Sequence, residues 1–184
     1  MLMETQAPGL KPQVFFPVST QKFAILSIAS FGIYPIYWFY QNWKRIRDAQ
    51  VPHDGVPYHG TRVSPLLRAT FAPLFIIPLL KRIKQQAEAS RVAVTWNTLP
   101  RGLGFVAVSL MALLPDPWWL LSIGIFEPIL APLETCQQIN AAAGNPEGVN
   151  DTYSAGNLAT IFIGALTWML LVVALTIAKP VTSP

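Results

Sequence analysis

Two charged residues in this sequence, Glu127 and Arg68, are candidates for an ion pair or a proton site because they lie in or beside apolar runs. Glu127 interrupts the apolar run 118–133, and Arg68 directly precedes the apolar run 69–80. A charge at bilayer depth is costly, so an acidic side chain inside a membrane segment suggests a functional ion pair or proton site. Arg68 is its natural partner, and Pro128 would free a helix carbonyl beside it, as in discontinuous transporter helices. The alternative is that Glu127 lies near an interface while Arg68 extends its charge toward water.

A second group of polar residues, His53, Asp54 and His59, carries imidazole and carboxylate groups that can bind a metal ion. They occur in a stretch that contains glycine and proline, and no second group of ligands completes the set. Surface loop residues are therefore the simpler interpretation, and we expect no metal and no other cofactor.

The sequence contains no Ser-His-Asp set, no phosphate-binding glycine loop and only one cysteine, Cys136. Nucleophilic or acid–base catalysis needs such groups in combination. We therefore expect a protein that is not an enzyme.

Composition indicates a membrane protein. Apolar residues make up 52% of the 184 residues and charged residues only 12%, against roughly 25% charged residues in ordinary globular domains. The net charge is +4, but the basic residues flank apolar runs rather than alternating with aromatic residues. This arrangement is typical of anchors at the cytoplasmic membrane surface and argues against a nucleic-acid partner.

The apolar runs predict an all-α fold, a polytopic membrane helical bundle with about four spans and a short re-entrant or interfacial helix. Residues 1–22 are polar and proline-rich, so we expect a flexible N-terminal tail followed by a single membrane domain, residues 23–180. The run 23–40 has the length of a first span, kinked at Pro35, with an aromatic cluster at its end. Lys44, Arg45 and Arg47 follow it and place that end in the cytoplasm.

The remaining runs complete this predicted topology. Residues 69–80 are too short for a full span and are followed by a polar helix over 81–90. Residues 102–114 and 118–133 are separated by Pro115-Asp116-Pro117, which we interpret as a tight outer turn, although a shallow hairpin is also compatible with the short first arm. The uncharged run 158–178 is the clearest span. The resulting topology has both termini outside.

An aromatic Gly-Ile-Tyr helix precedes a Ser-Pro-x-x-Arg segment within residues 31–83. The residues of this pattern, with two from a later Gln-x-x-Asn patch, are Gly32, Tyr34, Tyr37, Trp38, Asn42, Trp43, Ser64, Pro65, Arg68, Phe71, Gln137 and Asn140. The pattern resembles the uncharacterised bacterial multi-pass membrane proteins grouped as domain of unknown function 4234, most strongly over residues 31–83. The resemblance implies a bacterial inner-membrane protein and no established activity.

Two functions remain open at this stage. The first is a non-catalytic scaffold, accessory or lipid-contacting module whose basic face, residues 44–101, attracts anionic headgroups at about 1 kcal/mol per charge. The second is a small transporter or channel subunit that uses Glu127 and Arg68 in a path between proline-broken helices. Either could form a homo-oligomer or bind a membrane protein partner.

Overall fold

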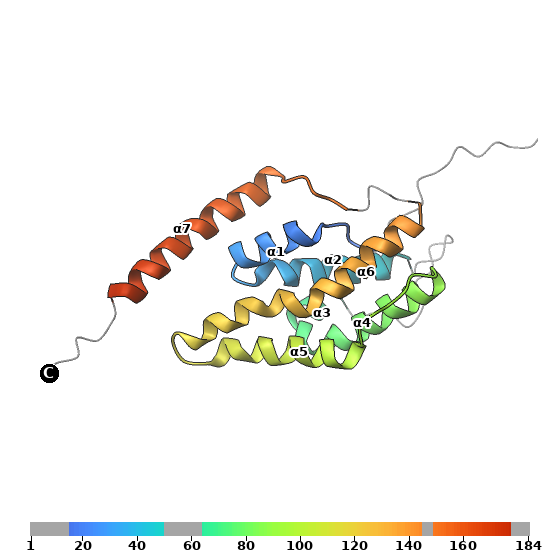
Figure 1. The fold of residues 1–184 in the computed structure, drawn as a ribbon, viewed down its shortest axis with the longest axis horizontal. Helices are drawn as coiled ribbons and strands as arrows, with labels where there is room; N and C mark the ends of the chain where they lie inside the picture. The colour runs from blue at the N-terminus through green and yellow to red at the C-terminus, as the bar shows by residue number, and fades with distance from the viewer. Residues whose placement is uncertain (1–14, 50–63, 145–148, 178–184) are drawn as a thin grey trace, which may run out of the picture.

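The computed structural model describes residues 15–49, 64–144 and 149–177. These residues form helices and connecting turns and contain no strand, which confirms the all-α fold for this part of the chain (Figure 1). The elements are α1 (Thr20–Ala29), α2 (Ile33–Ala49), α3 (Pro65–Thr70), α4 (Ala72–Ala89), α5 (Thr98–Leu110), η1 (Met111–Leu113), η2 (Trp118–Phe126), α6 (Glu127–Ala142) and α7 (Ala155–Ile177).

The first apolar run, 23–40, is a helical hairpin rather than the single kinked span that we expected. Helix α1 ends at Ala29, and Phe31 and Gly32 both adopt positive φ, 51° and 83°. The left-handed conformation reverses the chain, and the Gly32 amide donates to the Ser27 carbonyl at 2.9 Å. Pro35 falls in the first turn of α2, where its missing N–H costs nothing, so it does not kink the helix.

The second apolar run is divided between α3 and α4. Ser64 caps α3 by accepting a hydrogen bond from the Leu66 amide at 3.3 Å, and Pro65 occupies its first turn. The chain bends at Phe71 and continues as α4, which buries one face through Ile76, Leu79 and Ile83. The predicted polar continuation over 81–90 is confirmed, because α4 extends to Ala89.

The two runs on either side of the Pro115-Asp116-Pro117 turn form a second hairpin. Helices α5 and η1 make one arm, and η2 and α6 make the other. In Figure 1 this turn extends further toward the left than the turn between α1 and α2. The two hairpins therefore point the same way but reach different depths.

Helix α7 lies against the outside of this bundle (Figure 1). It is 23 residues long, carries no charge, and Gly164 is its one buried residue. A Cβ on Gly164 would collide with the backbone of Ala29 in α1. Close approach at a small residue is how helices pack inside membranes. Trp168 completes the contact by stacking on Phe31, with ring centroids 4.7 Å apart.

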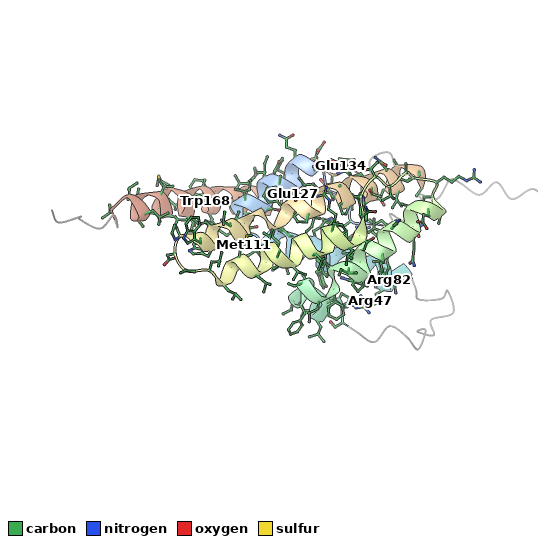
Figure 2. The ribbon with its side chains drawn as sticks, turned by 60° about the horizontal axis from the view of Figure 1, so that its bottom comes forward. Arg47, Arg82, Met111, Glu127, Glu134 and Trp168 are labelled. Atoms are coloured by element: carbon green, nitrogen blue, oxygen red, sulfur yellow. The ribbon has the colours of Figure 1, made fainter. Side chains whose placement is uncertain are left out.

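The chain segregates its charges to one end of the molecule. Helices α2 and α4 run toward this end and carry their basic residues in their C-terminal halves, and the C-terminal half of α6 contains Gln and Asn residues. Figure 2 shows Arg47 and Arg82 toward this end and Met111 and Trp168 toward the other. Residues 102–126 carry one charged side chain, Asp116. We call the two halves the basic end and the apolar end.

The folded body begins earlier than the expected boundary at residue 22. Phe15 and Val18 are 2% and 1% exposed, and Ser19 caps α1 by accepting from the Lys22 amide at 3.2 Å. Residues 15–22 therefore belong to the folded body, with Phe15 and Val18 in its core, rather than to a flexible tail. Aromatic side chains dominate that core, with Phe23, Trp38 and Phe39 fully buried.

Two helical stretches among the described residues are long and apolar enough to cross a membrane, Trp118–Ala142 and Ala155–Ile177. The most apolar part of the first is 39% buried inside the molecule, and that of the second only 6%. Four spans are not seen, since the first run turns back on itself.

Candidate functional site: a basic and aromatic cluster at the basic end

Trp43 on α2 is the centre of the candidate site. The guanidinium carbon of Arg68 on α3 lies 4.0 Å from the centroid of the indole ring. The guanidinium carbon of Arg82 on α4 lies 5.9 Å from the same centroid, and Arg68 is also 5.9 Å from the ring of Phe75. Both arginines are thus within range of cation–π attraction to one buried tryptophan. We call Trp43, Arg68 and Arg82 the arginine–tryptophan cluster.

Local sequence explains how the cluster assembles. The Ser64 cap and Pro65 start α3 one turn before Arg68, so the helix presents Arg68 to Trp43. On α4, Phe75 and Arg82 are seven residues apart and share a face. The two halves of the motif that carried the family resemblance, around Trp43 and around Arg68, therefore meet in space.

Burial makes the cluster electrostatically costly. Loss of solvent around Arg68 lowers the pKa of its guanidinium, and the neighbouring charge of Arg82 lowers that pKa further. Both effects disfavour the charged form, so a nearby negative charge would be stabilising. Burial likewise lowers the pKa of Arg45, whose guanidinium carbon lies 5.6 Å from the ring of Phe16.

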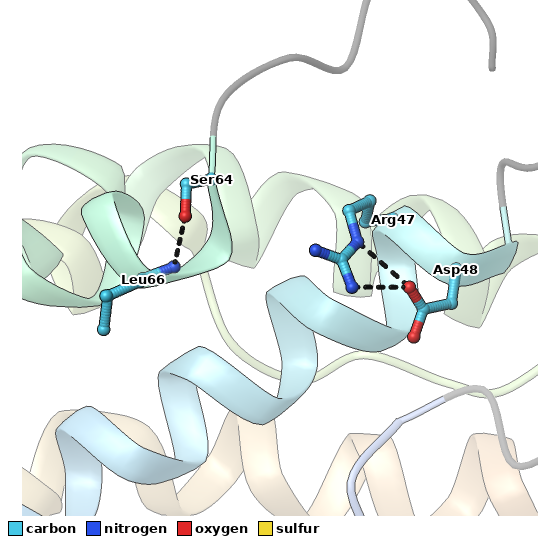
Figure 3. Close-up of polar contacts among 4 residues, drawn as sticks. All are labelled: Arg47, Asp48, Ser64 and Leu66. Atoms are coloured by element: carbon cyan, nitrogen blue, oxygen red, sulfur yellow. Dashed lines mark hydrogen bonds and ion pairs between the residues drawn. The ribbon is translucent and has the colours of Figure 1, made fainter.

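Arg47 forms an ion pair with the neighbouring carboxylate of Asp48. Its Nε and Nη2 atoms donate to the Asp48 carboxylate at 3.0 and 2.9 Å. Figure 3 shows this pair at the end of α2 and the Ser64 cap at the start of α3. Both side chains of the pair are about half exposed, so it contributes little to stability.

Glu127 and Arg68 are not brought together, which corrects the expected pairing. Glu127 accepts from Nη1 of Arg101 on α5 at 3.0 Å, and its side chain is 66% exposed. Arg68 lies against Trp43 instead. Glu127 begins α6, where a negative charge is favourable next to the unpaired amides of the first helical turn.

The predicted polar residues Asn42, Gln137 and Asn140 bind the N-terminal segment. Asn140 accepts from the Phe15 amide and donates to the Phe15 carbonyl, both at 3.0 Å. Asn42 accepts from the Phe16 amide at 3.0 Å. Gln137 donates to the Val18 carbonyl at 2.9 Å. These side chains therefore satisfy the backbone of an extended segment that has no strand partner.

The other residues of the family-like motif are divided between the core and the apolar surface. Trp38 is fully buried, and the Tyr34 amide donates to the Ser30 hydroxyl at 2.8 Å beside the turn at Gly32. Tyr37 and Phe71 are exposed. Tyr37 lines an open groove between α2 and α3.

This groove lies between α2 and α3, has a volume of about 290 Å³ and is almost entirely apolar. It is lined by Ile33, Ile36, Tyr37, Tyr40, Leu66, Ala69 and Thr70. The α2 residues at 33, 36, 37 and 40 form one helical stripe, and Trp43 continues it by one further step of three. The groove therefore ends one helical turn before Trp43 on α2, and its lining residue Ala69 directly follows Arg68 on α3.

No group of three or more His, Cys, Asp or Glu side chains that could hold a metal ion occurs among the described residues. His53, Asp54 and His59 lie outside those residues. Cys136 is buried in α6.

Sequence reasoning missed Arg82 as a site residue. Its seven-residue spacing from Phe75 was available as a signal, but a basic run such as Lys81-Arg82 is usually a solvated face. Only the packing of α4 against the other helices distinguishes Arg82 from the exposed Lys81.

The comparisons with known proteins found no relative: no family model, no curated protein and no solved structure matches this chain. The resemblance to the domain of unknown function 4234 group therefore stays a prediction.

Proposed function

We propose that this chain is a bacterial cytoplasmic-membrane protein that acts as a non-catalytic, lipid-contacting scaffold or accessory module. The observation that carries the proposal is α7, a 23-residue uncharged helix with one buried residue. Its exposed apolar side chains include Leu158, Phe162, Leu170 and Val173. A surface of this extent is stable against lipid and costly in water.

The arrangement of the elements supports a topology with the basic end in the cytoplasm. Helix α1 has 10 residues, about 15 Å at 1.5 Å per residue, and cannot cross a hydrocarbon core of about 30 Å. The α1–α2 hairpin is therefore re-entrant. By the same measure α7 is about 35 Å long and crosses fully. Positive charge favours the cytoplasmic side, so the described N-terminal residues lie inside and α7 ends outside.

The α5–α6 hairpin crosses twice in this proposal. Its first arm, residues 98–113, is about 24 Å long, slightly less than a thin bilayer of about 27 Å. Arg101 extends toward the cytoplasmic headgroups together with its partner Glu127. At the opposite tip, the Trp119 indole donates to Asp116 at 2.7 Å, a pairing suited to the outer headgroup region.

The basic end supplies the lipid contact. Its cationic side chains are Lys44, Arg45, Arg47, Arg68, Lys81, Arg82, Lys84, Arg91 and Arg101. Arg47 pairs with Asp48 and Arg101 pairs with Glu127, and the basic residues of this end outnumber its acidic ones. The excess positive charge would attract anionic headgroups at the cytoplasmic surface.

The transporter alternative loses its main support, because the two charges on which it rested lie in separate contacts. Glu127 is paired with Arg101 and exposed, whereas Arg68 stacks on Trp43. A homo-oligomer or a protein partner remains compatible with the exposed surface of α7.

Cysteine labelling in intact cells and inverted membrane vesicles tests the topology. In a Cys136→Ala background, Asp116→Cys should react with a membrane-impermeant maleimide from outside, and Glu88→Cys only from the cytoplasmic side. Ser30→Cys, at the tip of the α1–α2 hairpin, should react from neither side. Reaction of Ser30→Cys from outside would show that the first run crosses the bilayer. Recovery of the chain in the soluble fraction would overturn the membrane proposal itself.

A further inference from the structure

The arginine–tryptophan cluster contains hydrogen-bond donors that have no acceptor. The Nε atom of Arg68 and the Nε1 atom of Trp43 are buried and make no hydrogen bond in the described part of the chain. Trp43 as a whole is 2% exposed. Leaving a buried donor unpaired costs about 1–3 kcal/mol, so an acceptor supplied by a bound ion or ligand would be stabilising here.

The two ion pairs of the described residues do not include the arginines of the cluster. Asp48 pairs with Arg47 and Glu127 pairs with Arg101. Asp116 accepts from Trp119 at the apolar end. Arg68 and Arg82 take part in neither of the two ion pairs in the described residues and instead repel each other. Two neighbouring guanidinium groups without a carboxylate fit one phosphate group, whose oxygens accept from planar guanidinium donors.

The apolar groove between α2 and α3 indicates where the rest of such a ligand would lie. It contains about 290 Å³ and follows the stripe of α2 that ends at Trp43. On α3, Leu66, which lines the groove, and its neighbour Leu67 are 63% and 53% exposed and directly precede Arg68. A free phosphate ion would use the two arginines but leave this apolar surface uncovered. An acyl chain would cover it.

We infer that the arginine–tryptophan cluster and the groove beside it form a binding site for one anionic phospholipid. The phosphate binds Arg68 and Arg82 at the cytoplasmic surface, and an acyl chain lies along Tyr40, Tyr37 and Ile33 toward the apolar end. This inference rests on the proposed function, because the groove meets lipid only if the apolar end is inside a bilayer. It adds a defined site to the diffuse attraction of the basic end.

Binding can be measured by native mass spectrometry of the full chain in mild detergent, titrated with phosphatidylglycerol or phosphatidylcholine. The wild-type chain should retain one phosphatidylglycerol in preference to phosphatidylcholine. The double variant Arg68→Gln, Arg82→Gln removes two charges, and at about 1 kcal/mol per charge its affinity should fall roughly 30-fold. The matched control, Lys81→Gln, removes an exposed charge adjacent to Arg82 and should change affinity less than about 3-fold.

A second pair of measurements separates a lipid from a free phosphate. Thr70→Phe fills the groove without changing any charge, so phosphatidylglycerol binding should weaken while the arginines remain. Inorganic phosphate at millimolar concentration should not displace the lipid. If Thr70→Phe has no effect and inorganic phosphate competes as well as the lipid, the ligand is a free anion and the lipid assignment is wrong.

The outcomes distinguish this site from the proposed function. Equal weakening by the two single-charge variants, Lys81→Gln and Arg82→Gln, would show diffuse attraction and overturn the site, while leaving a lipid-contacting module intact. Absence of any preference for phosphatidylglycerol would overturn the site and the attraction of the basic end for anionic headgroups, whereas the membrane location rests on α7 and is tested by the labelling experiment. Because the double variant could unfold, Arg82→Gln alone is measured in parallel with circular dichroism, and it should retain the fold while binding several-fold more weakly.

Discussion

The side-chain amide of Asn140 pairs with both backbone polar groups of Phe15, 125 positions earlier in the chain. It donates to the carbonyl and accepts from the amide, each at 3.0 Å, in the manner of a neighbouring strand. Both residues are buried, so no water replaces these bonds. The pairing holds the N-terminal segment against α6. The chain is therefore folded from Phe15 onward, although its composition predicted a flexible tail up to residue 22.

Asn140→Ala should release this segment. Two buried backbone groups of Phe15 would lose their partners, at about 1–3 kcal/mol for each group. We expect a lower melting temperature in detergent and faster proteolysis near residue 15. Gln138→Ala, an exposed amide on the same helix, is the control and should change neither. Equal proteolysis of the two variants would mean that Asn140 does not hold the segment.

Gly164→Ala should separate α7 from α1. Its new methyl group would collide with the Ala29 backbone, which cannot move aside as a side chain can. Spin labels on α1 and α7 should therefore report a longer distance and a broader distribution. Gly156→Ala makes the same chemical change where a Cβ would meet only the Ser154 hydroxyl at 3.8 Å. This control should keep the wild-type distance, and a shift of similar size there would argue against the packing role of Gly164.

Glu127→Gln should have a small effect. The pair with Arg101 is exposed, and exposed pairs typically contribute about 0–1 kcal/mol. We expect a change in unfolding free energy below about 1 kcal/mol and no change in proton flux into proteoliposomes. Loss of a wild-type proton flux in this variant would restore the transporter hypothesis.

Lys22 should make stability depend on alkaline pH. Its ammonium donates to the Thr152 carbonyl at 2.6 Å and to Asn150 Oδ1 at 3.1 Å, while burial lowers its pKa and Asp151 partly opposes that shift. A lysine with a lowered pKa binds fewer protons in the folded state than in the unfolded state. Folding free energy therefore becomes more favourable as pH rises toward 10.5, the ordinary pKa of lysine.

The comparison for this prediction is Lys22→Met, which cannot titrate. The difference in melting temperature between wild type and Lys22→Met should shift in favour of wild type between pH 8 and pH 10.5. A constant difference would show that the folded chain does not lower this pKa.

The sequence by itself determined the helical class and the position of the uncharged helix α7. Runs of about twenty apolar residues are stable as helices in lipid because each helix satisfies its own backbone. It also determined the turn at residues 115–117, since proline and aspartate interrupt an otherwise apolar pattern. Such features depend only on local composition and could be predicted without the fold.

Tertiary structure decided the rest. Whether residues 23–40 form one span or a hairpin depended on two residues, Phe31 and Gly32, whose backbone is held in a left-handed turn by packing against Trp168 and Ile125. The partner of Glu127 depended on which helix packs beside α6. The hydropathy of the sequence could not predict it, because hydropathy does not show which helices pack together. The meeting of Trp43, Arg68 and Arg82 from three helices is a long-range contact for the same reason. Periodicity shows which face of a helix is apolar, whereas close packing selects the residues that it meets.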